Sequence, residues 1–315
     1  METGDLAVFA AVAQAGGITR AAQRLNTVQS NVTQRVRLLE AELGVPLFHR
    51  HSRGVSLTSA GRQLLPYAER IGRLMAEAKQ AAADSAVPRG QIIIGALETA
   101  TAMRLPPVLA AYASAYPDVD IEIVTGTSAA LLGAVRDRRV EAAFVAGPID
   151  HAELAALPLL DEELVLVSAP WLAVLDDVFA AVPLKLVVFR PGCTYRLRLE
   201  ALLAARGVVG VRRLEFGTLD GIIGCVGAGI GVTLLPRAAA AQAAAEGRVA
   251  LHRLPAEEAR VPTVLVRRTD AFVSTALSRF IETARRHLAT PRPARARRTR
   301  ADGARVDKFS LTTSR

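Results

Sequence analysis

Residues 18–43 form two short amphipathic segments, with a break of two or three residues between them at Asn26-Thr27. The first is good helix sequence that should begin at Thr19 as its N-cap, and its apolar face is made of Ala21, Ala22 and Leu25. The second has Thr27 as the expected cap and an apolar stripe at spacings of four, three and four residues: Val32, Val36, Leu39 and Leu43. Two such helices joined by a tight turn, the second polar on its outer face, are what a helix-turn-helix needs to fill the major groove of DNA.

Polar residues of the two helices and of the segment after them are the candidates for DNA contact. Residues 47–58 place apolar residues on both sides of a Ser-Arg-Gly turn, which predicts a small β-hairpin, or wing, with arginines at its tip. We expect base contacts from Gln29, Ser30, Thr33 and Gln34, with Asn31 beside them. For phosphates or the minor groove the candidates are Thr19, Arg35, Arg37, Arg50 and Arg53. One such helix alone would equally fit a small helical domain with a solvated face; the ordered set favours DNA binding.

A nearly continuous run of residues carries a family resemblance. The run is Ala21-Ala22…Leu25…Gln29…Val32-Thr33…Leu39-Glu40…Leu43-Gly44…Leu47-Phe48…Arg50…Arg53…Leu57-Thr58…Ala60-Gly61. It resembles the N-terminal domain of LysR-type transcriptional regulators over about sixty residues. Family members usually open the recognition helix with Ser-Gln-Pro, where this chain has Val28-Gln29-Ser30, so its operator sequence is not carried over from a relative.

Residues 59–88 are expected to be a linker built around one long helix. Apolar residues recur there at spacings of four and three, which is typical of a coiled coil and gives a rod of ~40 Å; they are Leu64, Ala68, Ile71, Met75, Ala78 and Ala82. Pro66 should bend this helix near its start. The alternative is an amphipathic helix on a globular core, but little sequence is at hand to supply that core. The resemblance implies that this helix makes a dimer and that dimers assemble into a tetramer.

After Val87-Pro88-Arg89-Gly90, strand and helix patterns alternate from residue 89 to 290, which indicates an α/β fold with mostly parallel sheets. The order resembles the effector domain of the same family, a periplasmic-binding-protein-like fold of two α/β subdomains around a cleft, at 90–160 with 268–289 and at 161–267. The whole chain is thus expected to be α/β with an all-α winged helix-turn-helix at 1–58. Residues 291–315 hold eight Lys or Arg against two Asp or Glu and are predicted to be a disordered basic tail, which adds either non-specific DNA affinity or nothing.

Ligands in open α/β sheets bind outside the carboxyl ends of the strands, against helix N-termini. The residues at those positions are Glu98, Thr99, Thr101, Thr127, Ser128, Gly147, Cys193, Thr194, Tyr195, Arg196, Gly217 and Thr218. For any single threonine or serine, helix capping is the simpler explanation; their clustering favours a site for an effector. With Glu98 facing Arg196, a ligand that carries both an amine and a carboxylate, such as an amino acid, is attractive. Segments 97–99 and 189–200 also resemble one branch of the family, which includes regulators of sarcosine oxidation and of cell-division genes.

Two alternatives to a ligand-responsive regulator remain open. Cys193 lies at a predicted helix N-terminus beside Arg190 and Arg196, conditions that lower a thiol pKa, so Cys193 and Cys225 could make the protein redox-responsive. Inert buried cysteines are the simpler explanation. The other alternative is a constitutive regulator whose cleft takes no ligand.

Other functions lack their sequence signals. The five histidines, including His49 and His51, show no metal-ligand spacing, and Gly227–Gly231 precedes its strand, unlike a dinucleotide-binding loop. We therefore expect no metal, no cofactor and no enzyme activity. Because no apolar run approaches ~18 residues and the N-terminus lacks a signal sequence, we expect a cytoplasmic protein with no membrane contact. Its expected partners are a double-stranded DNA operator, a small-molecule effector, further copies of itself and RNA polymerase.

Overall fold

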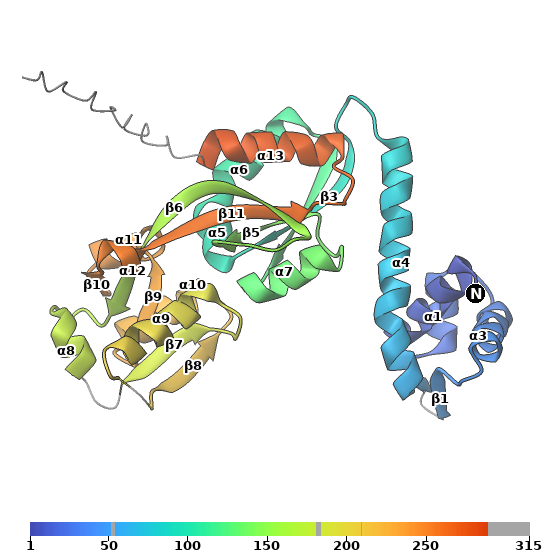
Figure 1. The fold of residues 1–315 in the computed structure, drawn as a ribbon, viewed down its shortest axis with the longest axis horizontal. Helices are drawn as coiled ribbons and strands as arrows, with labels where there is room; N and C mark the ends of the chain where they lie inside the picture. The colour runs from blue at the N-terminus through green and yellow to red at the C-terminus, as the bar shows by residue number, and fades with distance from the viewer. Residues whose placement is uncertain (52–53, 181–183, 209, 289–315) are drawn as a thin grey trace, which may run out of the picture.

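The computed structural model describes residues 1–51, 54–180, 184–208 and 210–288. Its N-terminal part contains the helices α1 (Thr3–Ala15), α2 (Ile18–Arg24) and α3 (Gln29–Leu43), followed by a hairpin of β1 (Phe48–His51) and β2 (Gly54–Leu57) (Figure 1). The two strands pair antiparallel, so the predicted hairpin is confirmed. The predicted stripe of α3 is also confirmed at Val32, Val36 and Leu39, which are fully buried, whereas Leu43 at the end of the helix is 38% exposed.

The two predicted N-caps are wrong. Helix α2 is preceded by Gly17 and α3 by Val28, both in extended backbone conformation and neither with a side-chain cap. The backbone carbonyls of these two residues begin the helices, because they accept hydrogen bonds from Ala21 N–H at 3.0 Å and from Val32 N–H at 3.4 Å. Thr19 therefore lies inside α2.

A long helix, α4 (Ser59–Ala83), connects the N-terminal domain to the rest of the chain (Figure 1). Its N-cap is Thr58, whose hydroxyl accepts a hydrogen bond from Gly61 N–H at 3.0 Å and donates to the Pro46 carbonyl at 2.8 Å. Pro66 lies within the helix. One face of α4 packs on α1, and other apolar side chains of the helix stay exposed: Tyr67, Leu74 and Met75.

The first subdomain of the effector domain consists of a sheet and four helices. The helices are α5 (Glu98–Met103), α6 (Leu105–Ala115), α7 (Ser128–Arg136) and α13 (Thr275–Leu288). Its strands are β3 (Gly90–Ala96), β4 (Val119–Thr125), β5 (Ala142–Ala146), and parts of β6 (Leu154–Ser168) and β11 (Arg260–Arg268). The second subdomain contains β7 (Lys185–Phe189), β8 (Arg212–Phe216), β9 (Thr233–Pro236), β10 (Ala250–Arg253), α8 (Leu175–Ala180), α9 (Thr194–Ala205), α10 (Leu219–Gly227), α11 (Arg237–Ala245) and α12 (Ala256–Ala259).

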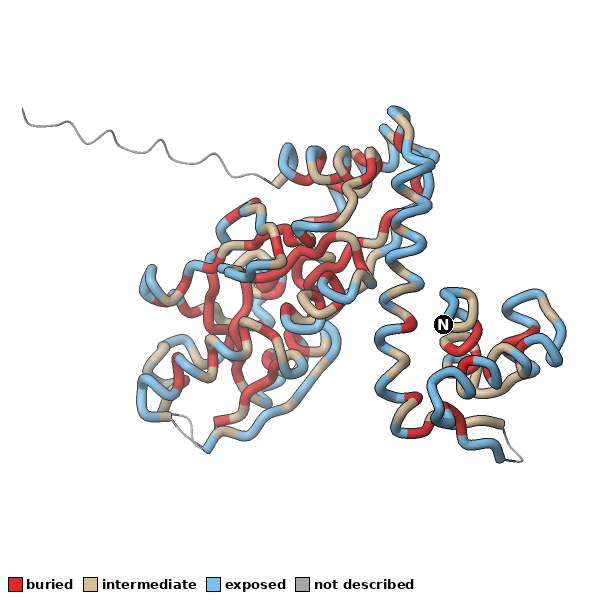
Figure 2. The backbone as a smooth tube through the Cα atoms, turned by 45° about the vertical axis from the view of Figure 1, so that its right-hand side comes forward, coloured by how far each residue is buried: buried red, intermediate tan, exposed pale blue. Residues whose placement is uncertain are grey.

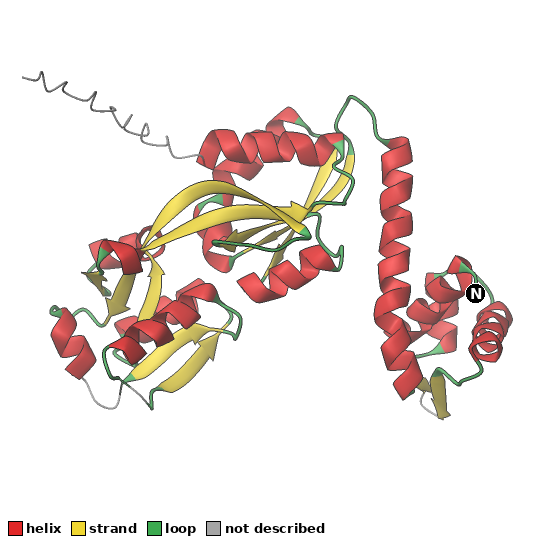
Figure 3. Cartoon of the chain, viewed as in Figure 1, coloured by secondary structure: helices red, strands yellow, loops and turns green. Residues whose placement is uncertain are grey.

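The prediction of mostly parallel sheets is wrong. Parallel pairing joins β3 to β4 and β5, and β7 to β8, but β6 and β11 pair antiparallel along their lengths and β6 is also antiparallel to β9 and β10. The reason is that the chain crosses between the subdomains twice, once in each direction, so the two crossing strands run side by side and opposed. Figure 3 shows these two long strands extending from one subdomain to the other.

One buried cluster of the effector domain extends across both subdomains, and a second cluster lies within the second subdomain (Figure 2). In the first subdomain, the rings of Tyr112 and Phe280 meet edge-on at 5.4 Å, and Phe280 and Phe144 at 6.2 Å, so α13 closes the core against α6 and the sheet. Among the described residues, none of the helices is both long enough and apolar enough to cross a membrane. Residues 291–315, predicted to be a basic tail, lie outside the described residues.

Candidate functional site

The outer face of α3 carries a shallow, open hollow lined by polar side chains. Four of the predicted base-reading residues and one arginine line it together with two apolar residues: Gln29, Ser30, Thr33, Gln34, Arg37, Leu38 and Ala41. All of these polar residues are exposed except Thr33, which is half-buried. The Thr19 hydroxyl donates to Gln29 Oε1 at 3.3 Å and so ties α2 to the start of α3. The buried apolar stripe on the opposite side of α3 packs against the rest of the domain, so the polar face is exposed to solvent.

Other predicted DNA contacts are placed differently. Arg35 points toward α1, where its guanidinium lies 3.6 Å from Asp5 and is half-buried, and its contact with a phosphate stays a prediction. Asn31, in the first turn of α3, donates to the Thr27 hydroxyl at 2.9 Å and so bonds the helix to the turn that precedes it. Arg50, on the wing, is 43% exposed and lies 3.9 Å from Glu40.

Glu40 of α3 holds the segment that leads into β1 of the wing. Its Oε1 accepts hydrogen bonds from the backbone N–H groups of Leu47 at 2.7 Å and Phe48 at 3.2 Å. His49 and His51, both on β1, are exposed. Arg53, at the predicted tip of the wing, lies outside the described residues.

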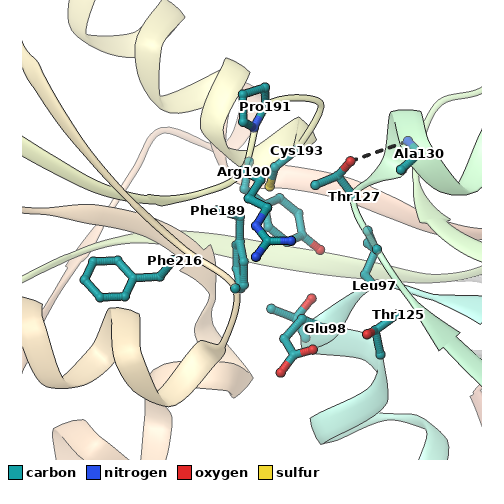
Figure 4. A pocket seen from close by; sticks show the side chains of 14 residues that line it. Leu97, Glu98, Thr125, Thr127, Ala130, Phe189, Arg190, Pro191, Cys193 and Phe216 are labelled. Atoms are coloured by element: carbon teal, nitrogen blue, oxygen red, sulfur yellow. Dashed lines mark hydrogen bonds between the residues drawn. The ribbon is translucent and has the colours of Figure 1, made fainter. Parts of the chain in front are cut away.

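A cavity of about 350 Å³ lies between the two subdomains of the effector domain (Figure 4). Residues from the ends of β3, β4, β7 and β8 and from the helices that follow them line it: Leu97, Glu98, Thr99, Thr125, Gly126, Thr127, Ala130, Phe189, Arg190, Pro191, Cys193, Tyr195, Phe216 and Gly217. This is where the strand-end rule predicted a ligand site.

Glu98 and Arg190 bring opposite charges to this cavity. Figure 4 shows their side chains extending toward the same space from the two subdomains. Among the side chains that the structure describes, neither forms a hydrogen bond or an ion pair within the protein. The walls beside them include the rings of Phe189 and Phe216. The cavity thus combines a carboxylate, a guanidinium and apolar surface.

Arg196 does not face Glu98, and this prediction is corrected. Its guanidinium donates to Glu215 at 2.7 Å and to Glu200 at 3.2 Å, and it does not line the cavity. These two carboxylates lie on β8 and one turn further along α9, so they hold the side chain away from the cleft. Arg190, directly after β7, supplies the cationic group instead; the same strand-end rule would have selected it.

Several predicted effector residues serve the protein's own structure. Ser128 and Thr194 hydrogen-bond to each other across the cleft, with 3.0 Å between their hydroxyl oxygens. Thr218 caps α10 by accepting from Gly221 N–H at 3.3 Å, and Thr101 donates to the Leu97 carbonyl at 3.1 Å. Gly147 N–H donates to the Pro262 carbonyl at 2.7 Å. None of these five residues lines the cavity, although Thr127, Thr99, Tyr195, Cys193 and Gly217 do.

Burial governs the ionisable groups behind the cavity. It raises the pKa of the Tyr195 hydroxyl, which a hydrogen bond from Thr99 partly opposes. Burial also raises the pKa of the Cys193 thiol. Backbone N–H groups at the start of α9 lower this pKa, but their effect is smaller than that of burial. The expectation of a lowered thiol pKa is therefore wrong. Both cysteines are free.

One ion pair of the effector domain is partly buried. Arg104, between α5 and α6, donates to both carboxylate oxygens of Glu162 on β6, at 2.9 and 2.7 Å. The Glu162 side chain is only 7% exposed. The pair joins the first subdomain to one of the two crossing strands.

Residues 3–62 match the family model "Bacterial regulatory helix-turn-helix protein, lysR family", and residues 85–289 match "LysR substrate binding domain". The chain belongs to the LysR family of transcriptional regulators. It is 40% identical over 288 residues to the "HTH-type transcriptional regulator GltR" of Bacillus subtilis (strain 168), covering 91% of this chain and 97% of that protein. The LysR resemblance of the sequence is thus confirmed, and the chain is a DNA-binding regulator with an effector-binding domain, not an enzyme.

Two solved structures show the same fold. ArgP from Mycobacterium tuberculosis matches with a TM-score of 0.64 at 22% identity, over 91% of this chain and 97% of that one. Full-length CbnR in complex with its target DNA matches with a TM-score of 0.63 at 24% identity, over 91% of this chain and 100% of that one. In the part of this LysR-family chain that the structure describes, no group of three or more His, Cys, Asp and Glu side chains is arranged to hold a metal ion.

Proposed function

We propose that this LysR-type regulator binds a small amino acid in its effector cavity, with the ligand carboxylate at Arg190 and the ligand ammonium at Glu98. The observation that carries the proposal is the pair of opposite charges, one from each subdomain, that find no partner among the described residues of the protein. Arg190 is exposed and Glu98 is half-buried, so both charges are within reach of a ligand, and a zwitterion would pair with both. Phe189 and Phe216 offer apolar surface to the ligand's side chain, and about 350 Å³ suits a small metabolite.

The DNA-binding half of the proposal rests on the exposed face of α3. Gln29, Ser30, Thr33 and Gln34 are the residues that we assign to base edges, and Arg37 and Arg50 to phosphates. We propose that residues 59–88 pair two copies through the exposed apolar side chains of α4 and that two such dimers form a tetramer. Two recognition helices would then read a two-fold-related operator. A cytoplasmic location and contact with RNA polymerase belong to the same proposal.

The ligand proposal is tested by a thermal-shift screen of the full chain against amino acids, amines and small carboxylates. A ligand at a hundred times its dissociation constant adds ~2.7 kcal/mol of stability, which is easily seen as a raised melting temperature. Only compounds with both charged groups should give the full shift. Arg190→Gln and Glu98→Gln should each abolish it.

Arg196→Gln is the matched control, because it removes a nearby arginine that lies in the first turn of α9 and outside the cavity. Its ligand response should stay, with some loss of basal stability. A shift that survives Arg190→Gln and is lost in Arg196→Gln would overturn the assignment. A blank across the panel would favour a constitutive regulator.

A further inference from the structure

Helix α7 (Ser128–Arg136) has one end at the effector cavity and the other at the linker helix α4. Thr127, its N-cap, and Ala130, in its first turn, line the cavity. Nine helical residues span about 13 Å at 1.5 Å each. The helix therefore connects the effector cavity to the linker helix α4 (Figure 1).

The N-terminal end of α7 is bonded to the second subdomain. The Ser128 hydroxyl accepts from Thr194 Oγ1 at 3.0 Å, and Ala129 N–H donates to the Gly192 carbonyl at 3.2 Å. Gly192 has a φ of +89°, and a Cβ there would lie 2.8 Å from that of Ala129. Only glycine permits this close approach, so the contact between the two subdomains depends on backbone as well as on side chains.

The C-terminal end of α7 is bonded to α4. Arg73 of α4 donates from Nε to the Asp137 carbonyl at 2.5 Å, where a cation also favours the negative end of the helix dipole. One turn further along α4, Glu77 forms an ion pair with Arg138. The other oxygen of Glu77 accepts from Phe272 N–H at 2.7 Å, so α4 is bonded to two segments of the first subdomain.

Arg138 is held in an unfavourable backbone conformation at this joint. Its φ is +57°, in the left-handed region that non-glycine residues rarely adopt. Its side chain is only 11% exposed and bonds to Asp270 at 3.2 Å as well as to Glu77. Backbone strain of this kind is retained where surrounding contacts enforce it, and it concentrates at functional positions.

We propose that α7 is a strut that couples closure of the effector cleft to the position of the linker helix. This rests on the proposed function, since closure matters to a regulator whose cleft binds a ligand. A short helix bonded at both ends transmits displacement along its axis, because its own hydrogen bonds resist stretching. When the second subdomain moves, its bonds to Ser128 and Ala129 pull on the N-terminal end of α7, and the joint of Asp137 and Arg138 with α4 moves with the helix.

The strut is tested by hydrogen–deuterium exchange on the full chain, without effector and without DNA. Thr194→Val removes the hydroxyl that bonds Ser128 while keeping the shape of the side chain. Exchange should speed up in residues 190–197, and also in residues 70–84 and at Phe272. The expected acceleration is ~5-fold or more, which is the lower end of typical couplings between two sites. Glu77→Gln should in turn speed exchange in residues 190–197, because such coupling is reciprocal.

Thr283→Val is the matched control, since it removes another largely buried hydroxyl, one that donates to the Arg279 carbonyl within α13. It should leave residues 70–84 unchanged. Exchange changes confined to residues 190–197 in Thr194→Val would overturn the strut, as would equal acceleration in α11, which would mean general destabilisation. Failure of the ligand proposal appears separately, as a blank metabolite panel.

Discussion

On the outer face of α3, Gln29, Ser30 and Gln34 are exposed, whereas Ser128 and Thr194 beside the effector cleft are hydrogen-bonded to each other. The recognition helix keeps its polar groups available because a separate apolar stripe holds it in place. In the effector domain, polar groups such as these two hydroxyls hold the two subdomains together, although they do not line the cavity. Substitutions should therefore change affinity in the first region and stability in the second.

The largest effect is expected from Arg104→Ala. It would leave the Glu162 carboxylate buried without its partner, which costs about 3 kcal/mol of unfolding free energy. Urea unfolding followed by the fluorescence of Trp171, the only tryptophan of the chain, reports on the effector domain. Arg139→Ala, which breaks a half-exposed pair with Asp137, should stay within about 0.5 kcal/mol of the parent protein. Equal losses in the two variants would contradict the distinction.

The next effect concerns pH and Glu141, which lies beside α4. Burial, and then the charge of Glu77, raise the pKa of Glu141 to about 7 from 4.5, although a hydrogen bond from Ile93 N–H lowers it. The folded state therefore holds the proton more tightly than the unfolded state. This stabilisation is complete below pH 4.5 and is lost as the pH rises through 7, a change on the order of 3 kcal/mol.

Glu141→Gln should flatten this part of the stability profile between pH 5 and about pH 8 in urea titrations. Glu122→Gln, at an exposed position on β4, should leave the profile unchanged. A variant Glu141→Gln with the same pH dependence as the parent would show that another group is responsible.

A smaller effect, and one of the opposite kind, is expected on α3. Gln34→Ala should weaken binding to DNA that the protein itself selects from a random-sequence pool by about 2 kcal/mol, roughly 30-fold, with no loss of thermal stability. Fluorescence anisotropy measures this affinity, and Gln242→Ala on α11 is the control with an unchanged dissociation constant. If Gln34→Ala lowered the melting temperature instead, the contrast between the two regions would not hold.

The smallest effect separates capping from ligand contact within the cleft. Thr127 and Thr218 are both N-caps, accepting from Ala130 N–H at 3.4 Å and Gly221 N–H at 3.3 Å, but only Thr127 lines the cavity. Each change to alanine should lower the unfolding free energy by about 1 kcal/mol. Only Thr127→Ala should also reduce the thermal shift produced by a compound found in the metabolite screen. Equal ligand responses in the two variants would argue against a ligand contact at Thr127.

What the sequence could predict was mainly local. The spacing of Val32, Val36 and Leu39 defined the buried side of α3, and the turn between residues 47 and 58 defined the wing. The position of the cavity followed from strand ends. The choice between Arg190 and Arg196 did not, because it depends on Glu215, which lies on a separate strand. The antiparallel pairing of β6 with β11 joins segments about a hundred residues apart and leaves no local pattern.

That pairing has a consequence for synthesis of the chain. Strand β11 lies between β5 and β6, and Phe280 of α13 completes the aromatic cluster with Tyr112 and Phe144. The first subdomain thus stays unfinished on the ribosome until almost all of the described chain has emerged. The DNA-binding domain, whose core comes from residues 6–71, has all its parts much earlier. During translation, the half that reads DNA is ready to fold before the half that regulates it.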